Sequence, residues 1–395
     1  FQAEDGIRDF CLSRGLGDVY KRQGFIGGGH NSLIGILHKI SAYMHDRYEI
    51  VGGVFNSKYE DSLESAREIG ITKDRIYKDV DDMIAVENEI PTESRIEAVC
   101  ILTPNNSHFE IAKKFLENKY HIICEKPLTI SLGEAKYLLS IKEKNNLVFA
   151  VTHTYTGYPM VRQMTKMISE GLIGNIQRVD SQYLQGWINP IIHEKKKRKS
   201  SWRLDPKISG ISSCVADIGT HAFNMLELVT GLKVHKVLSD INSLYNDNPL
   251  DIDANILVRM NNGAKGVIRS SQIATGEENN LRVSIYGDKG YLKWQQENPN
   301  KLYFLKENEP IKVLKPGHEY NYPITLNSSK LPPGHPEGIF DAMGNIYLGA
   351  AKAIRGENFY DHEFPTIYEG VRGMDFIEKV IESHNRGNVW LELEK

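Results

Sequence analysis

Short apolar runs alternate with helix-like segments in the first part of the chain, and this alternation constrains the fold more than any other feature. We expect strands at Gly24–Ile26, Glu49–Phe55, Ala98–Leu102, His121–Cys124 and Leu147–Val151. Between them apolar side chains recur at helical spacing, and Ser131 with Glu134 forms a capping box that opens one helix. Strands that alternate with helices predict a doubly wound parallel sheet of the Rossmann, nucleotide-binding kind.

The pattern changes after about Thr154, where long β-patterned stretches are joined by turn signals such as "NNG" at Asn261–Gly263. These stretches are Ile176–Trp187, His235–Ile241, Ala254–Met260, Gly266–Ile273, Leu281–Tyr286 and Tyr291–Trp294. They predict an open, mainly antiparallel sheet. Helices expected at Asp217–Val229 and Phe340–Ile354 would cover one face, and another at Thr366–Ser383 would pack on either half. The 395 residues therefore suggest an α/β domain at 24–154 and an α+β domain at 155–395.

Residues 1–23 lack the sequence pattern of the rest of the chain. They start without Met, lack apolar periodicity and end in Lys21, Arg22 and Gln23, where a buried first strand should be apolar. The stretch resembles the translation of a sequencing adaptor joined to a truncated reading frame. We therefore expect a non-native or disordered leader. A native signal upstream would be lost from this sequence, so a cytoplasmic location is expected only by default.

Composition limits the classes of partner. A net charge of −3 with 25% charged residues favours neither nucleic acid nor a membrane surface. No apolar run reaches the roughly 18 residues that a membrane-spanning helix needs. Four cysteines without a C-x-x-C pair indicate neither a disulfide framework nor a zinc site, and we expect a reducing compartment. The charged run Glu194–Arg203 is interpreted as a solvated loop, because the rest of the chain is not basic.

The stretch "GFIGGGHNSLIG" follows the first expected strand and nearly matches a dinucleotide-binding fingerprint. Gly27 and Gly29 fit the G-x-G part, where backbone N–H groups approach a pyrophosphate at a helix N-terminus. The third glycine is displaced to Gly35, which can still serve helix–strand packing. Asn31 and Ser32 are candidates for the helix cap.

The end of the second expected strand carries no carboxylate to bind the ribose hydroxyls of NAD. Asn56, Ser57 and Lys58 stand there instead. Ser57 and Lys58 could hold a 2′-phosphate, so NADP is at least as plausible a cofactor as NAD. An ordinary polar turn is the alternative.

Three further motifs carry chemistry: "TPNNSH" at Thr103–His108, "EKPLT" at Glu125–Thr129 and "DIGTH" at Asp217–His221. Their order after the glycine loop resembles that in the Gfo/Idh/MocA family of nicotinamide-dependent sugar and polyol oxidoreductases. The likeness extends to "WR" at Trp202–Arg203 and "GHPEG" at Gly334–Gly338. It implies an NAD(P)-dependent dehydrogenase or reductase acting on a sugar, inositol or related polyol. Besides the glycine loop and the second strand, the expected cofactor contacts are Thr103, Asn105, His108, Glu125, Trp202 and Arg203.

The candidate catalytic residues are Lys126, Asp217 and His221. Lys126 follows a parallel strand at the edge where ligands bind, although alone it could be a surface lysine. Asp217 and His221 are four residues apart and would share one helix face, where a structural pair or a metal pair are the alternatives. The resemblance favours catalysis: it implies that this lysine is catalytic and that the aspartate and histidine serve the substrate site. We expect His221 to accept the proton and Lys126 to orient the oxygen, while the residues leave the choice of base open; no metal is expected.

Substrate contacts are less defined, because Thr156 stands where the family commonly has an arginine. Aromatic and polar side chains suited to a hydroxyl-rich ligand are Tyr155, Tyr158, Arg162, Trp187 and His335. The resemblance also implies a homodimer or homotetramer formed through the C-terminal sheet. Two rival functions are an NAD-dependent glycosidase, which needs the same hydride machinery, and a non-catalytic sugar or nucleotide sensor, against which the retained Lys126, Asp217 and His221 argue.

Overall fold

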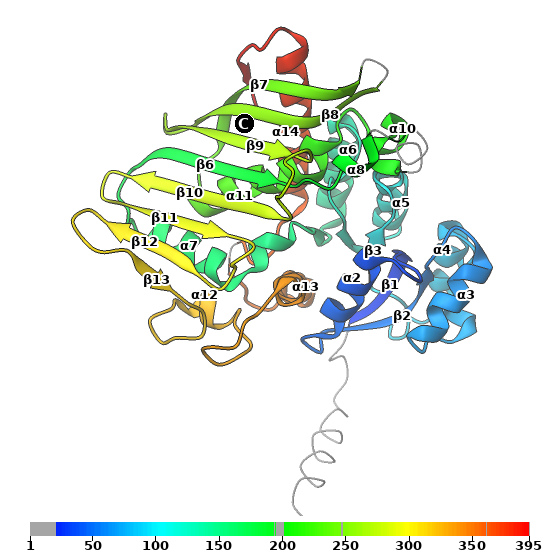
Figure 1. The fold of residues 1–395 in the computed structure, drawn as a ribbon. Coiled ribbons are helices and arrows are strands. Elements are labelled where there is room, and N and C mark those ends of the chain that lie inside the picture. Colours follow the sequence, from blue (N-terminus) through cyan, green and yellow to red (C-terminus); the bar gives the residue numbers. More distant parts are fainter. Residues whose placement is uncertain (1–20, 193, 195–200, 246–247, 361, 395) are drawn as a thin grey trace, which may run out of the picture.

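Five parallel strands form the first sheet of the computed structural model, which describes residues 21–192, 194, 201–245, 248–360 and 362–394. The strand order is β2-β1-β3-β4-β5 (Figure 1). The strands are β1 (Lys21–Gly27), β2 (Tyr48–Val54), β3 (Ala98–Leu102), β4 (His121–Cys124) and β5 (Phe149–Val151). The chain order reverses direction between β1 and β3, the switch point where open α/β sheets bind ligands. The predicted doubly wound parallel sheet is confirmed.

The first strand begins three residues earlier than predicted. Lys21 and Arg22 pair with Tyr48 and Glu49 of β2. Lys21 Nζ lies 2.7 Å from the Glu97 carboxylate, so that a charged side chain is tolerated at the start of the strand. Residues 1–20 lie outside the described residues, and the origin of the leader stays a prediction.

Five helices flank this sheet, and three of them begin at a side-chain cap, supplied by Ser32, Asp79 or Ser131. Ser131 Oγ accepts a hydrogen bond from Glu134 N at 3.3 Å, as the capping box predicted. The helices are α2 (Leu33–Tyr43), α3 (Tyr59–Glu68), α4 (Val80–Glu89), α5 (Asn105–Glu117) and α6 (Leu132–Asn145), with a 3-10 turn at Lys73–Arg75.

Nine strands form the second sheet, in the order β13-β12-β11-β10-β6-β9-β8-β7-β14. All described pairs are antiparallel except β6 with β9, so the prediction of a mainly antiparallel sheet is confirmed. The strands are β6 (Ile176–Leu184), β7 (Val234–Tyr245), β8 (Asn248–Met260), β9 (Lys265–Ser271), β10 (Asn280–Gly287), β11 (Gly290–Gln295), β12 (Leu302–Lys306), β13 (Lys312–Leu314) and β14 (Leu391–Glu392). The predicted boundary near residue 154 falls in a 3-10 turn, Thr154–Gly157.

Helices cover one face of the second sheet and also join it to the first (Figure 1). Here α7 (Pro159–Ser169) and α11 (Thr220–Thr230) pack on the sheet, whereas α13 (Ile339–Arg355) packs against α2. The last helix, α14 (Ile367–Asn385), contacts both β7 and α6. Shorter pieces are α8 (Asn189–Ile192), a 3-10 turn at Trp202–Leu204, α10 (Pro206–Ser209), a π-helical turn at Val215–Gly219 and α12 (Pro323–Leu326). In the part of the chain that the structure describes, no helix combines the length and apolarity needed to cross a membrane.

Candidate active site

The backbone of the glycine loop lies close to the backbone of the helix that follows it, as in a dinucleotide-binding loop. Gly27 and Gly28 have φ of +83° and +70°, which favour glycine. A Cβ at Gly29 would lie 2.2 Å from Asn56 Nδ2, and a Cβ at Gly35 would lie 2.2 Å from Gly28 O. The predicted packing role of Gly35 is therefore confirmed, while the positive φ at Gly28 was not anticipated.

The start of α2 faces the loop. Ser32 is its N-cap and accepts a hydrogen bond from Gly35 N at 3.0 Å, and Asn31 has a φ of +63°. Free backbone N–H groups at such a helix end attract anions. The residues present thus fit the pyrophosphate of a dinucleotide.

A cavity of about 600 Å³ lies between the glycine loop and the end of β2. Asn56 and Ser57 line it as predicted, whereas Lys58 is exposed at the N-cap of α3 and does not. Its lining also includes His30, Lys78 and Asp79, which sequence reasoning missed. His30 follows Gly29 in the glycine loop, and this position in the fingerprint could have identified it as a lining residue.

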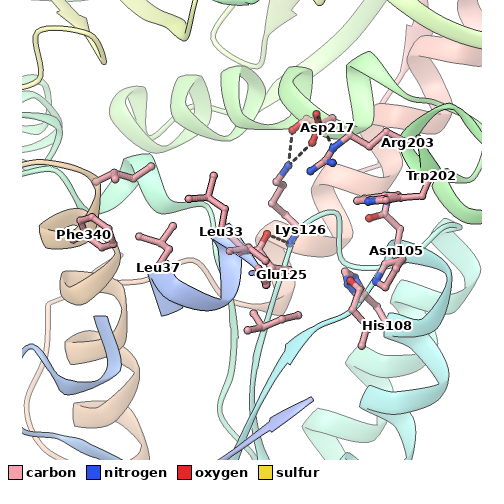
Figure 2. A pocket seen from close by; sticks show the side chains of 16 residues that line it. Leu33, Leu37, Asn105, His108, Glu125, Lys126, Trp202, Arg203, Asp217 and Phe340 are labelled. Atoms are coloured by element: carbon pink, nitrogen blue, oxygen red, sulfur yellow. Dashed lines mark hydrogen bonds and ion pairs between the residues drawn. The ribbon is translucent and has the colours of Figure 1, made fainter. Parts of the chain in front are cut away.

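A second cavity, of about 630 Å³, shares Ser32, Leu102, Thr103 and Pro104 with the first. Figure 2 shows the side chains that line it. Among them are the predicted residues Thr103, Asn105, His108, Glu125, Lys126, Trp202, Arg203 and Asp217. Its apolar wall, missed by sequence reasoning, consists of Leu33, Ile34, Leu37, Ile339 and Phe340. Leu33, Ile34 and Leu37 belong to α2, whose apolar spacing predicts a helix but not a cavity wall, and nothing local in the sequence points to Phe340.

Lys126 and Asp217 meet at one end of the second cavity (Figure 2). Lys126 Nζ lies 2.9 Å from Asp217 Oδ1 and 2.7 Å from its backbone oxygen. The other carboxylate oxygen lies 3.0 Å from Gln272 Nε2 and 3.5 Å from Arg203 Nε. Burial alone would raise the pKa of Asp217, but the charges of Lys126 and Arg203 hold this pKa below its usual value. Asp217 is therefore ionised at neutral pH, and Gln272 is a partner that the sequence did not reveal.

His221 lies one helical turn beyond Asp217 but is not among the residues that line the cavity. Its ring packs edge-on against Tyr155 and His153, with centroids 4.8 and 5.4 Å away, and its Nδ1 is buried without a hydrogen-bond partner in the described chain. Burial and the charge of Lys126 lower its pKa well below the usual value, so the imidazole is uncharged at neutral pH. The single helix predicted for this stretch begins instead with the π-helical turn that holds Asp217, a feature often found at functional sites.

His108 connects the two loops that form the cavity wall. Its ring nitrogens lie 2.9 Å from Pro127 O and 2.8 Å from Thr103 O. Ser107 Oγ also donates to Thr103 Oγ1 at 2.7 Å. These bonds hold the ends of β3 and β4 in register at the binding edge.

Two of the predicted substrate residues are buried tyrosines, of which Tyr155 packs against His221. Tyr155 is 7% exposed, and its hydroxyl lies 2.5 Å from that of Tyr183. Tyr158 is 2% exposed and packs against Trp294. Tyr155 thus supports the ring of His221 rather than the wall of the cavity.

The other three predicted substrate residues lie away from the cavity. The guanidinium of Arg162 is buried and donates to Ser328 Oγ at 2.6 Å and to Glu363 O at 2.7 Å, so it joins α7 to the segments around α13. Trp187 and His335 are exposed and line neither cavity described above.

Comparison with known proteins agrees with this arrangement. A family model described as "Oxidoreductase family, NAD-binding Rossmann fold" matches residues 21–153, and one described as "GFO/IDH/MocA C-terminal domain" matches residues 161–293. The uncharacterized oxidoreductase YfiI of Bacillus subtilis is 33% identical, over 94% of this chain and 96% of its own length. A levoglucosan dehydrogenase of Pseudarthrobacter phenanthrenivorans is 31% identical over 52% of this chain and 57% of its own.

Solved structures show the same likeness. An inositol dehydrogenase homolog from Azotobacter vinelandii, complexed with NAD+, superimposes with a TM-score of 0.87 at 31% identity, over 94% of this chain and 97% of that one. The same homolog complexed with NADH and myo-inositol gives a TM-score of 0.85 at 30% identity, with the same coverage.

Proposed function

The chain belongs to the Gfo/Idh/MocA family and is an NAD-binding oxidoreductase of the sugar and inositol dehydrogenase type, and from this we propose that it oxidises or reduces an uncharged polyol. The observation that carries the proposal is the Lys126–Asp217 pair, which lines a cavity that shares four lining residues with the glycine-loop cavity.

The charge balance of the cavity supports an uncharged substrate. Its cations are Lys126 and Arg203, and both of them face the Asp217 carboxylate, while Glu125 adds a second negative charge. Each cation among the described lining residues therefore has an anionic neighbour, so none of these cations is free to bind a phosphate. The relatives crystallised with myo-inositol or named for levoglucosan act on, or bind, molecules of this neutral class.

The chemistry is divided among the chain's own residues. When bound, NAD supplies the acceptor or donor of hydride. Lys126 orients and polarises the substrate oxygen, since its ammonium can exchange Asp217 for a hydroxyl at hydrogen-bond distance. Asp217, an ionised carboxylate that lines the cavity, holds that hydroxyl and can accept its proton, whereas His221 does not line the cavity.

We also propose that the protein self-associates through the uncovered face of the second sheet. Leu257 and Tyr286 are 48% and 37% exposed there, while their neighbours Ile256 and Ile285 are buried under the helices. Light scattering should give a dimer or tetramer mass, and Leu257→Arg should reduce it; a monomeric wild type would contradict this proposal.

A substrate panel tests the function. Purified protein is incubated with inositols, anhydrosugars, free sugars and sugar phosphates plus NAD or NADP, and the absorbance of the reduced cofactor is followed. NADP is included because Ser57 and Lys78 border the first cavity and no carboxylate stands at the tip of β2. We expect turnover with a neutral polyol. Turnover with sugar phosphates alone would overturn the substrate class, and release of the aglycone from aryl glycosides without net reduction would favour a glycosidase.

A further inference from the structure

A chain of buried polar side chains runs from the cavity wall into the protein interior. Glu125 Oε1 accepts from His38 Nε2 at 2.9 Å and from Thr152 Oγ1 at 2.6 Å, and its Oε2 accepts from Lys126 N at 3.2 Å. On the other side of the imidazole, His38 Nδ1 lies 2.8 Å from Tyr347 Oη. The chain therefore links α2 and α13 to the loop that carries Lys126.

Charge fixes the direction of the hydrogen bond between His38 and Glu125. Burial would raise the pKa of Glu125, but the hydrogen bond and charge of His38, together with Lys126, lower it to about 2. An ionised carboxylate only accepts, so His38 Nε2 carries a proton and donates it. His38 Nδ1 faces the hydroxyl of Tyr347 and, at 3.3 Å, the thiol of Cys100, each of which can donate or accept. The fully buried imidazole is thus held from both sides.

Lys126 has two carboxylates as neighbours, Glu125 and Asp217. Glu125 and Asp217 both interact with the Lys126 ammonium, and only Asp217 accepts a hydrogen bond from Nζ. Without His38, the buried Glu125 carboxylate would lose one of its two side-chain donors, and the remaining cation that acts on it is Lys126. The ammonium would then turn away from Asp217 and from the position of the substrate oxygen.

We propose that His38 is a positioning residue: it occupies the Glu125 carboxylate and so leaves Lys126 paired with Asp217. The expected change in kcat rests on the proposed function, whereas the expected change in the Lys126–Asp217 pair does not. The proposal concerns a residue that contacts neither substrate nor cavity.

The test compares four variants with the wild type. His38→Leu removes the donor, and His38→Gln keeps an N–H that can reach Glu125. Glu125→Gln in the His38→Leu background removes the charge that competes for Lys126. Tyr48→Phe is the matched control, because its buried hydroxyl has no partner in the described chain and its ring packs 5.3 Å from that of Tyr347 without joining the network.

The first readout is the Lys126 Nζ to Asp217 Oδ1 distance in crystal structures, which requires no turnover. We expect the pair to break in His38→Leu, with Nζ against Glu125, and to persist in the other three variants. With the substrate found by the panel, kcat of His38→Leu should fall about ten- to a hundredfold while KM for NAD changes less than about twofold. His38→Gln should recover most of kcat.

An intact Lys126–Asp217 pair in His38→Leu would overturn the inference, as would equal losses of kcat in His38→Leu and His38→Gln. If His38→Leu does not fold, the double variant still tests the inference, because a broken Lys126–Asp217 pair in a chain without the Glu125 charge would contradict it. A wild type without turnover would refute the proposed function, whereas the crystallographic distances would still test the role of His38.

Discussion

Gly35→Ala tests the packing of the glycine loop on α2. A methyl group at this position would lie 2.2 Å from Gly28 O and 2.7 Å from Gly28 C and Cα. All three atoms are backbone, so no side chain can rotate away. The loop and the helix would have to separate by about 1 Å to restore ordinary van der Waals contact.

Two opposing effects set the size of the change. Alanine in a helix is favoured over glycine by about 0.5–1 kcal/mol, whereas forcing an extra carbon into a packed contact costs about 1–3 kcal/mol. We expect a net loss of about 1–2 kcal/mol of unfolding free energy. Because displacement of the loop also moves the N–H groups that would hold a pyrophosphate, the Kd for NADH should rise about ten- to a hundredfold.

The assay combines thermal unfolding with a fluorescence titration by NADH. Gly133→Ala in α6 is the matched control, because a Cβ there meets no atom within 4 Å. The control should bind NADH as the wild type does and unfold at the same or a slightly higher temperature. If Gly35→Ala behaves like Gly133→Ala in both measurements, the loop does not pack as described and the reasoning fails.

Three further changes have expected outcomes. Lys126→Met should lower kcat about 10²–10⁴-fold while the Kd for NADH by fluorescence titration stays near the wild-type value, and loss of NADH binding would instead assign Lys126 to cofactor retention. Burial and Lys21 lower the pKa of His121 to about 4 in the folded state, below its unfolded value of about 6.5, so the unfolding free energy should fall as pH decreases through that interval. In urea titrations, His121→Asn should remove about 2 kcal/mol of the difference between pH 7 and about pH 4.5, and an unchanged difference would contradict the assigned cause. Gln23 is fully buried in β1 and both of its side-chain amide atoms lack partners in the described chain, so Gln23→Val should raise the unfolding free energy by about 1–2 kcal/mol in the same titration, and a decrease would reveal a partner.

Sequence reasoning worked where the determining interactions are local. Periodicity located the strands of the first sheet and the helices α2, α5 and α6, but not α3 and α4. Ser32 and Ser131 were recognisable as caps because each bonds a backbone N–H three residues away. The rule that ligands meet parallel strands at their carboxyl ends correctly placed Thr103 and Lys126 on one cavity.

It failed where a side chain's environment is set by distant segments. Lys21 looked unsuited to a strand because its partner, Glu97, is 76 residues away. Arg162 looked available for substrate because the groups that bury it lie more than 160 residues further along the chain. Neither interaction leaves a periodic or spacing signal.

The pairing of Lys126 with Asp217 is the most important contact that local sequence patterns could not predict. Lys126 and Asp217 were each predicted, but 91 residues separate them: Lys126 lies in the loop after β4, and Asp217 lies in the π-helical turn before α11. Their meeting depends on how the two halves pack, and α13 and α14 contact elements of both halves. Tyr347 of α13 also reaches His38, so the helix that helps to set the packing is bonded to the network behind Lys126. Local sequence motifs therefore identify the residue types needed for chemistry. The short distance between Lys126 and Asp217, which makes them a site, depends on the tertiary structure.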